Sequence, residues 1–225
     1  MIDWAWIADH LDDLASRMVQ HLYLTGIAVA IGFAISFALA VLAVRRRRLY
    51  GPIVAVTGLL YTIPSIALFP FFVPLTGLTD ITAEIPLVLY SLLIFVRNIG
   101  AGFDGVPRDV LESADGSGYT PWLRFRRIEV PLATPLIVAG IRLATVSTIG
   151  LVTITGLLGD RFGGLGFFIF EGIRHVFPTE IFAGALASIV LAVAADLLLV
   201  AVQRRLTPWA PRPVSTRGSA RPAMT

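Results

Sequence analysis

Five long apolar runs constrain this chain more than any other feature of its sequence. They cover residues 22–44, 53–75, 85–103, 136–158 and 181–203. Each is close to the roughly 20 residues that an α-helix needs to cross a bilayer at about 1.5 Å per residue. Only 15% of the residues are charged, whereas a soluble domain carries about a quarter. The sequence therefore predicts an all-α integral membrane protein with about five transmembrane helices.

The distribution of arginine predicts how these spans are oriented. If Arg45–Arg48 lie in the cytoplasm, the alternation of five spans places fourteen arginines inside and three outside, with Arg142 within a span. Cytoplasmic segments of membrane proteins are enriched in Arg and Lys. We therefore expect the N-terminus outside and the C-terminus inside. Because membrane topology accounts for the basic charge, no nucleic acid partner is expected.

The segments that flank the spans differ in character. Residues 1–20 lack the basic start of a cleavable signal and carry four aspartates. Apolar residues recur there at helical spacing, namely Trp4, Ile7, Leu11, Leu14 and Met18. This pattern predicts an amphipathic helix on the outer face, with a partly ordered tail as the alternative. Residues 206–225 are rich in Pro, Ser and Arg, which predicts a disordered cytoplasmic tail.

Several kinds of chemistry are not expected from these residues. The chain has no cysteine, and His10, His21 and His175 match no metal-ligand spacing, so no metal site is predicted. Ser117 is expected inside and His175 outside, so they cannot form a nucleophile–base pair. We therefore expect no enzymatic activity from this chain.

Two ionisable residues fall within the predicted spans at similar depth in the cytoplasmic half. Arg142 lies in the fourth span and Asp196 in the fifth. Charges within a membrane are costly and usually paired or facing water. One hypothesis is an Arg142–Asp196 ion pair that ties these spans together. The alternative is that Arg142 extends independently toward the inner headgroups.

The polar segment at residues 111–132 lies in the longest predicted cytoplasmic loop. Asp109 and Glu112 have the spacing of a capping box, which predicts a short helix that ends at Gly118. Thr120 and Pro121 are typical of an N-cap and a first helical residue, so a second helix is expected from there until Pro131 breaks it.

A second feature of the same loop is a row of small residues. Ala114 and Gly118 are four apart and leave one face of the first helix nearly free of side chains. A short projecting helix with such a face is suited to insertion into a groove on another protein.

These residues carry a resemblance to a known family. The pattern Glu112-x-Ala114-x3-Gly118-x9-Ile128-x-Val130-Pro131 resembles the "EAA" loop of the permease subunits of ATP-binding-cassette importers. Two positions depart from the family pattern, with Ser113 in place of Ala and Val130 in place of Leu. The resemblance implies that Glu112, Ala114, Gly118, Ile128 and Pro131 couple the permease to an ATPase.

Longer stretches at 61–78, 89–122 and 139–166 are similar to the permeases of osmoprotectant importers, which carry glycine betaine, choline, carnitine or proline betaine. The resemblance implies a type I importer fold over residues 21–205, with a cytoplasmic coupling loop at 104–131. It also implies a multi-pass protein of a bacterial or archaeal cell membrane that moves its solute by alternating access.

The partners that the resemblance implies are separate chains. They are a second permease, identical or paralogous, two cytoplasmic ATPases that use ATP and Mg, and an extracytoplasmic solute-binding protein, all assembled at the lipid bilayer. No cofactor is expected on this chain itself. A permease for amino acids such as methionine is the alternative within this class. A stand-alone channel or secondary carrier is the alternative from another class.

Polar and aromatic residues within the spans are candidates for the translocation pathway because such groups can line a cavity. They are Tyr61, Thr62, Ser65, Tyr90 and Asn98. Each could equally form helix–helix hydrogen bonds or anchor at the interface.

Overall fold

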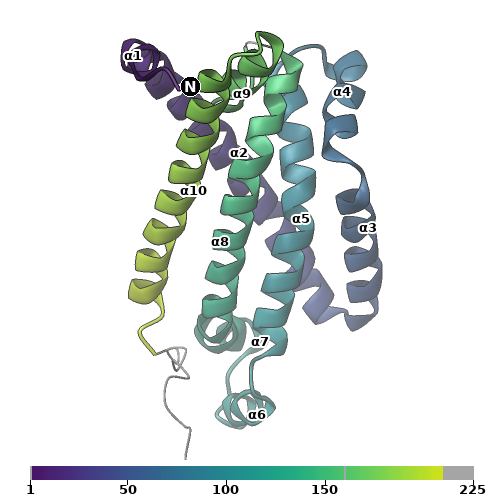
Figure 1. Ribbon diagram of the computed structural model, residues 1–225. Helices are drawn as coiled ribbons and strands as arrows, with labels where there is room; N and C mark the ends of the chain where they lie inside the picture. Colours follow the sequence, from purple (N-terminus) through teal and green to yellow (C-terminus); the bar gives the residue numbers. More distant parts are fainter. Residues whose placement is uncertain (1, 160, 210–225) are drawn as a thin grey trace, which may run out of the picture.

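The computed structural model describes residues 2–159 and 161–209, and all regular structure within them is helical (Figure 1). The α-helices are α1 (Trp4–Asp9), α2 (Leu11–Arg45), α3 (Tyr50–Thr62), α4 (Ser65–Thr76), α5 (Asp80–Asp104), α6 (Arg108–Gly116), α7 (Pro121–Arg124), α8 (Val130–Ile154), α9 (Gly166–Arg174) and α10 (Pro178–Leu206). Three short segments have other helical geometries. The 3₁₀-helices η1 (Arg47–Leu49) and η3 (Thr155–Leu158) are wound more tightly than an α-helix, and the π-helix η2 (Phe125–Glu129) is wound more widely. Residues 210–225, most of the expected tail, lie outside the described residues.

Four helical stretches are long and apolar enough to cross a membrane, and a fifth crossing exists if a bent pair is counted as one span. The stretches are α2, α5, α7 through η3, and α10. The bent pair joins η1 and α3 to α4 at an angle of 93°. The prediction of about five spans is thus confirmed, but the second span is broken rather than straight.

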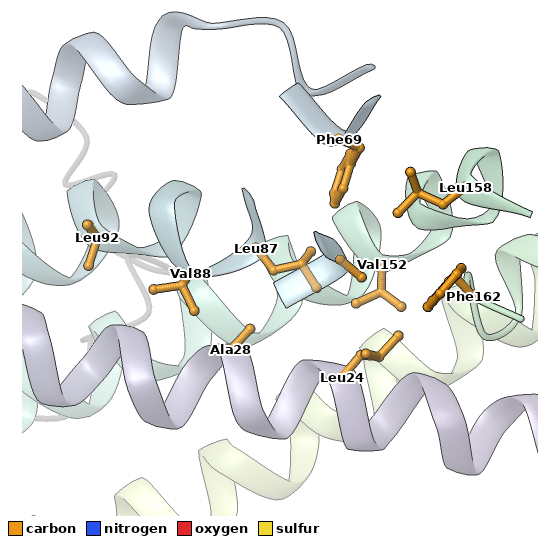
Figure 2. Close-up of a cluster of buried hydrophobic side chains, with 10 residues drawn as sticks. Leu24, Ala28, Phe69, Leu87, Val88, Leu92, Val152, Leu158 and Phe162 are labelled. Atoms are coloured by element: carbon orange, nitrogen blue, oxygen red, sulfur yellow. The ribbon is translucent and has the colours of Figure 1, made fainter. Parts of the chain in front are cut away.

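The helices pack around α5, which lies against α2, α3, α4 and α8 (Figure 1). One core cluster joins α2, α4, α5 and α8 with the loop after η3 (Figure 2). Its buried members are Leu24, Ala28, Phe69, Ala83, Leu87, Val88, Leu92, Val152, Leu158 and Phe162. In contrast, α10 leaves most of its apolar surface exposed. Burial therefore centres on α5, while α10 presents its apolar side chains outward.

The N-terminal segment differs from the helix expected over residues 1–20. Asp3 caps only the short α1, accepting hydrogen bonds from the N–H groups of Ala5 and Trp6. From Leu11 onward the chain already belongs to α2. Leu14 and Met18 pack against a buried cluster of α8, α10 and the loop before α9. The apolar stripe is therefore partly covered by the chain itself.

A buried histidine holds the glycine-rich loop before α9 in place. His21 is fully buried, and its Nε2 donates to the Ile149 carbonyl at 2.9 Å while its Nδ1 accepts the Leu165 N–H at 3.3 Å. Gly164 has φ +48°, and a Cβ there would lie 2.7 Å from the His21 Cβ. Only glycine allows the loop this close to α2, so His21 ties α2 to both α8 and the loop.

Candidate functional site

The most unusual backbone within the membrane-spanning region is the break between α3 and α4. Pro64 has no N–H to donate, and it disfavours helical geometry at the residue before it. Ile63 accordingly is extended at φ −67° and ψ 129°, and Pro64 follows at φ −58° and ψ 125°. Non-helical backbone at membrane depth is tolerated where protein buries it or where it lines a cavity. The position of the break therefore follows from the local sequence Thr62-Ile63-Pro64-Ser65.

A cavity of about 340 Å³ opens at this break. Its walls come from α3, α4, α5 and α8. The lining residues are Tyr61, Thr62, Ile63, Pro64, Ser65, Tyr90, Ser91, Ile94, Ser147, Thr148 and Leu151. This lining combines two aromatic rings with several hydroxyl groups and contains no ionisable side chain other than the two tyrosines.

Two tyrosines form one wall of the cavity. The ring centroids of Tyr61 and Tyr90 lie 5.5 Å apart with an interplanar angle of 64°. The Tyr90 hydroxyl donates to the Ile63 carbonyl at the break, and its side chain is buried. Tyr61 is 43% exposed. The hydrogen bond thus fixes one ring against the break, while the other remains accessible.

The structure brings together four of the five residues expected in the pathway, namely Tyr61, Thr62, Ser65 and Tyr90. Asn98 lies apart from them. Its Nδ2 donates to the Ile94 carbonyl at 2.8 Å, and its side chain packs against Gly140. Its hydrogen bond is thus to its own helix, and its side chain contacts α8 at Gly140.

Among the other lining residues, three carry hydroxyl groups and were not sequence candidates: Ser91, Ser147 and Thr148. Each is a hydroxyl residue inside an apolar run, which is the only signal the sequence offers for them. Many Ser and Thr side chains in helices donate a hydrogen bond to a carbonyl of their own helix. A hydroxyl residue in an apolar run therefore does not by itself indicate a binding site.

The second candidate site is the projecting pair α6 and α7, at the end of the molecule opposite α9 (Figure 1). Gly118 has φ +80°, as expected for the residue that ends α6. Its N–H donates to the Asp115 carbonyl at 3.0 Å, and the Tyr119 N–H donates to the Ala114 carbonyl at 3.1 Å. These two bonds form a Schellman motif.

The start of the second helix also follows the prediction. Thr120 caps α7 by accepting the Leu123 N–H at 3.3 Å, and Pro121 is its first residue.

Two other local predictions for this loop were wrong. Asp109 is not an N-cap, because α6 begins at Arg108 after Pro107. The fixed φ of Pro107, −61°, already turns the chain into the helix one residue early. Pro131 does not end the second helix either. The π-helical η2 widens the turn before it, so the missing N–H is accommodated and the chain continues into α8.

The projecting helices are firmly joined to each other and to the membrane region. Arg124 of α7 donates to Asp115 of α6 at 2.5 Å and to Glu129 at 2.9 Å. Phe125 stacks on Phe103 at the end of α5, with centroids 5.6 Å apart. These contacts connect α6 and α7 to the end of α5 and to the segment that leads into α8.

Of the five loop residues expected to couple to an ATPase, some face outward and some inward. Glu112 and Gly118 are exposed, whereas Ala114 is 5% exposed. Ala114 and Ile128 line a hollow of about 420 Å³ between α6 and η2. Pro131 is partly buried. Ala114 and Gly118 therefore do not share one open face, because α6 turns Ala114 toward its own chain.

The structure brings the two intramembrane charges together. Arg142 Nε donates to Asp196 Oδ1 at 3.0 Å, and Arg142 Nη2 donates to Asp196 Oδ2 at 3.1 Å. Arg142 Nη1 also donates to Gln203 Oε1 at 3.0 Å. This bidentate pair joins α8 to α10, most of whose apolar side chains are exposed.

Residues 19–209 match the family described as "Binding-protein-dependent transport system inner membrane component". The chain belongs to this family. It is thus the permease of a binding-protein-dependent importer, located in the membrane.

Among the curated relatives of this permease, the osmoprotectant import permease protein OsmW of Salmonella typhimurium is 39% identical over 208 residues, or 90% of this chain and 96% of the relative. The glycine betaine/carnitine/choline transport system permease protein OpuCB of Bacillus subtilis is 37% identical over 196 residues, covering 87% and 89%. The MetNI methionine transporter, solved in an inward-facing conformation, matches the fold with a TM-score of 0.75 at 20% identity, covering 86% and 96%.

The match to the MetNI transporter confirms the type I importer fold.

Within residues 2–159 and 161–209, the permease contains no group of three or more His, Cys, Asp or Glu side chains that could hold a metal ion.

Proposed function

We propose that this permease forms the translocation pathway for an osmoprotectant such as glycine betaine, choline or carnitine. The observation that carries the proposal is its 35–39% identity, over most of their length, to permeases that are named for the transport of these solutes. The cavity at the α3–α4 break is part of the pathway. It is the place where broken backbone, aromatic rings and hydroxyl groups meet within the membrane.

The permease acts with separate chains. A second permease, identical or paralogous, completes the pathway, and two cytoplasmic ATPases supply the energy from ATP and Mg. An extracytoplasmic binding protein delivers the solute. The contacts of Arg124 and Phe125 support this role for the loop, because they connect α6 and α7 to the end of α5 and to the segment that leads into α8.

Within the loop the five coupling residues have different parts. Glu112 offers an exposed carboxylate to the ATPase, and Gly118 sets the turn that presents α6. Ala114 and Ile128 line the hollow behind α6, and Pro131 follows the π-turn at the start of α8. The solute is released inside when the pathway returns to its inward-facing state.

Uptake by the reconstituted complex tests this function. Proteoliposomes that contain the permease, its ATPase and its binding protein should accumulate labelled glycine betaine, choline or carnitine only when ATP is inside. Labelled methionine is the control solute. Accumulation of methionine alone, or uptake without ATP, would contradict the proposal.

A further inference from the structure

We infer that the cavity at the α3–α4 break binds the quaternary ammonium group of the solute, with Tyr61 and Tyr90 as its aromatic contacts. This inference rests on the proposed function and adds to it a binding site in the permease itself. The ligand class is a trimethylammonium cation, whether the rest of the solute is an alcohol or a carboxylate.

The aromatic wall provides the first argument. The face of an aromatic ring is negatively polarised and attracts a cation within about 6 Å of its centroid. Tyr61 and Tyr90 lie 5.5 Å apart and are inclined at 64°, so their rings form two sides of a corner rather than a closed stack. Such a corner contacts methyl groups that spread in several directions. The hydrogen bond from Tyr90 to the Ile63 carbonyl holds one side of it rigid.

The hydroxyl groups provide the second argument. The Thr62 hydroxyl donates its hydrogen to the Leu59 carbonyl at 2.7 Å. The Tyr90 hydroxyl donates to Ile63. With their hydrogens engaged, these oxygens offer lone pairs to the cavity. A quaternary ammonium has no N–H group, so it is stabilised by such oxygens without needing a hydrogen bond.

The absence of acidic side chains from the cavity lining provides a third argument. The C-terminal end of α3 at Thr62 and the N-terminal end of α4 at Ser65 both lie on its wall, so their opposite partial charges oppose each other. No Asp or Glu lines the cavity. Attraction without an ion pair gives weak binding, which suits a pathway from which the solute must leave.

Direct binding of choline to the nucleotide-free permease–ATPase complex, without the binding protein, tests this inference. Saturation-transfer NMR measures weak binding of the choline methyl groups in nanodiscs made of lipids without choline headgroups. The comparison ligand is 3,3-dimethylbutan-1-ol, which has the shape of choline with a neutral carbon in place of the nitrogen. Choline has no carboxylate, so its binding reports on the ammonium site alone.

We expect choline to bind and its neutral analogue to bind at least tenfold more weakly. Tyr61→Leu should weaken choline binding about tenfold, which corresponds to about 1.4 kcal/mol for one cation–aromatic contact. Tyr61→Phe keeps the ring and should stay within about twofold. Phe71→Leu is the matched control, because Phe71 is an exposed aromatic of α4 that does not line the cavity.

Equal binding of choline and its neutral analogue would overturn the inference. So would unchanged choline binding in Tyr61→Leu, or no choline binding by a complex that transports choline. The proposed function fails separately, through the uptake assay. A complex that binds choline through Tyr61 but transports none of the three osmoprotectants would support this site and contradict that function.

Discussion

Gly118 allows the role of the projecting loop to be tested with a small perturbation. Its φ of +80° lies in the left-handed region, which a residue with a Cβ adopts at a cost of about 1–2 kcal/mol. A Cβ at this position would meet no atom within 4 Å. The penalty of Gly118→Ala is therefore conformational, and we expect about 1 kcal/mol, confined to the turn between α6 and α7. Gly118→Val should cost more, because β-branched residues rarely adopt positive φ.

Gly116→Ala is a matched control. Gly116 is the last residue of α6, and a Cβ there also meets nothing within 4 Å. Its φ is not in the left-handed region. Alanine is favoured over glycine in a helix by about 0.5–1 kcal/mol, so this substitution should stabilise α6. Gly118→Ala and Gly116→Ala, two residues apart, should thus have opposite effects on the stability of this part of the loop.

Hydrogen exchange of the membrane-embedded permease measures the local effect. In the peptide that contains residues 111–132, Gly118→Ala should speed exchange about fivefold, as expected for a loss of about 1 kcal/mol. Gly116→Ala should slow it. Exchange in Gly118→Ala no faster than in the unmodified permease would refute the reasoning on the turn.

The functional consequence follows from the same turn. We expect Gly118→Val to insert normally but to lose transport, with the ATPase either dissociated or hydrolysing ATP without moving solute. Co-purification of the ATPase on a tagged permease, with transport and hydrolysis assays, measures this. Full transport by Gly118→Val with normal ATPase retention would show that the loop is not the coupling element.

Three further predictions concern the membrane region. A cysteine that replaces Asp80 should react with an impermeant reagent added outside, whereas one that replaces Arg47 should not; the reverse would invert the orientation. Neutralising either Arg142 or Asp196 should lower the thermal stability of the permease, and the double variant should recover part of the loss. The expected coupling energy is about 0.5–3 kcal/mol, and strictly additive losses would contradict an Arg142–Asp196 ion pair. His21→Leu should cost about 1–3 kcal/mol, because a buried backbone N–H loses its acceptor, and unchanged thermal unfolding would contradict this role.

The features that the sequence determined by itself depend on local rules. A span requires a long apolar run, because the hydrocarbon core cannot solvate backbone groups, so the spans are visible without any tertiary contact. The Gly118 turn and the Thr120–Pro121 helix start follow from the conformations available to those residues alone. Pro64 similarly breaks the second span, although the sequence prediction treated 53–75 as one run.

Local rules failed where neighbouring structure offered another solution. Pro131 would end an isolated helix, but the wider turn of η2 accommodates it, and the packing of Phe125 on Phe103 stabilises the continuous path into α8. Asp109 has the pattern of a cap, yet Pro107 starts the helix first. In both cases two local sequence features favour different helix boundaries. The spacing of the residues alone does not predict which boundary the folded chain adopts.

Only the tertiary structure decided which polar residues meet. Hydropathy places Arg142 and Asp196 at similar depth, but the rotation of α8 and α10 about their axes decides whether they face each other. The same rotation of α8 brings Ser147 to the tyrosine cavity, whereas Asn98 shares a face of α5 with Tyr90 and Ile94 and lies farther along that helix. Rotation is set by how side chains from helices distant in sequence interlock, and no single segment contains that information.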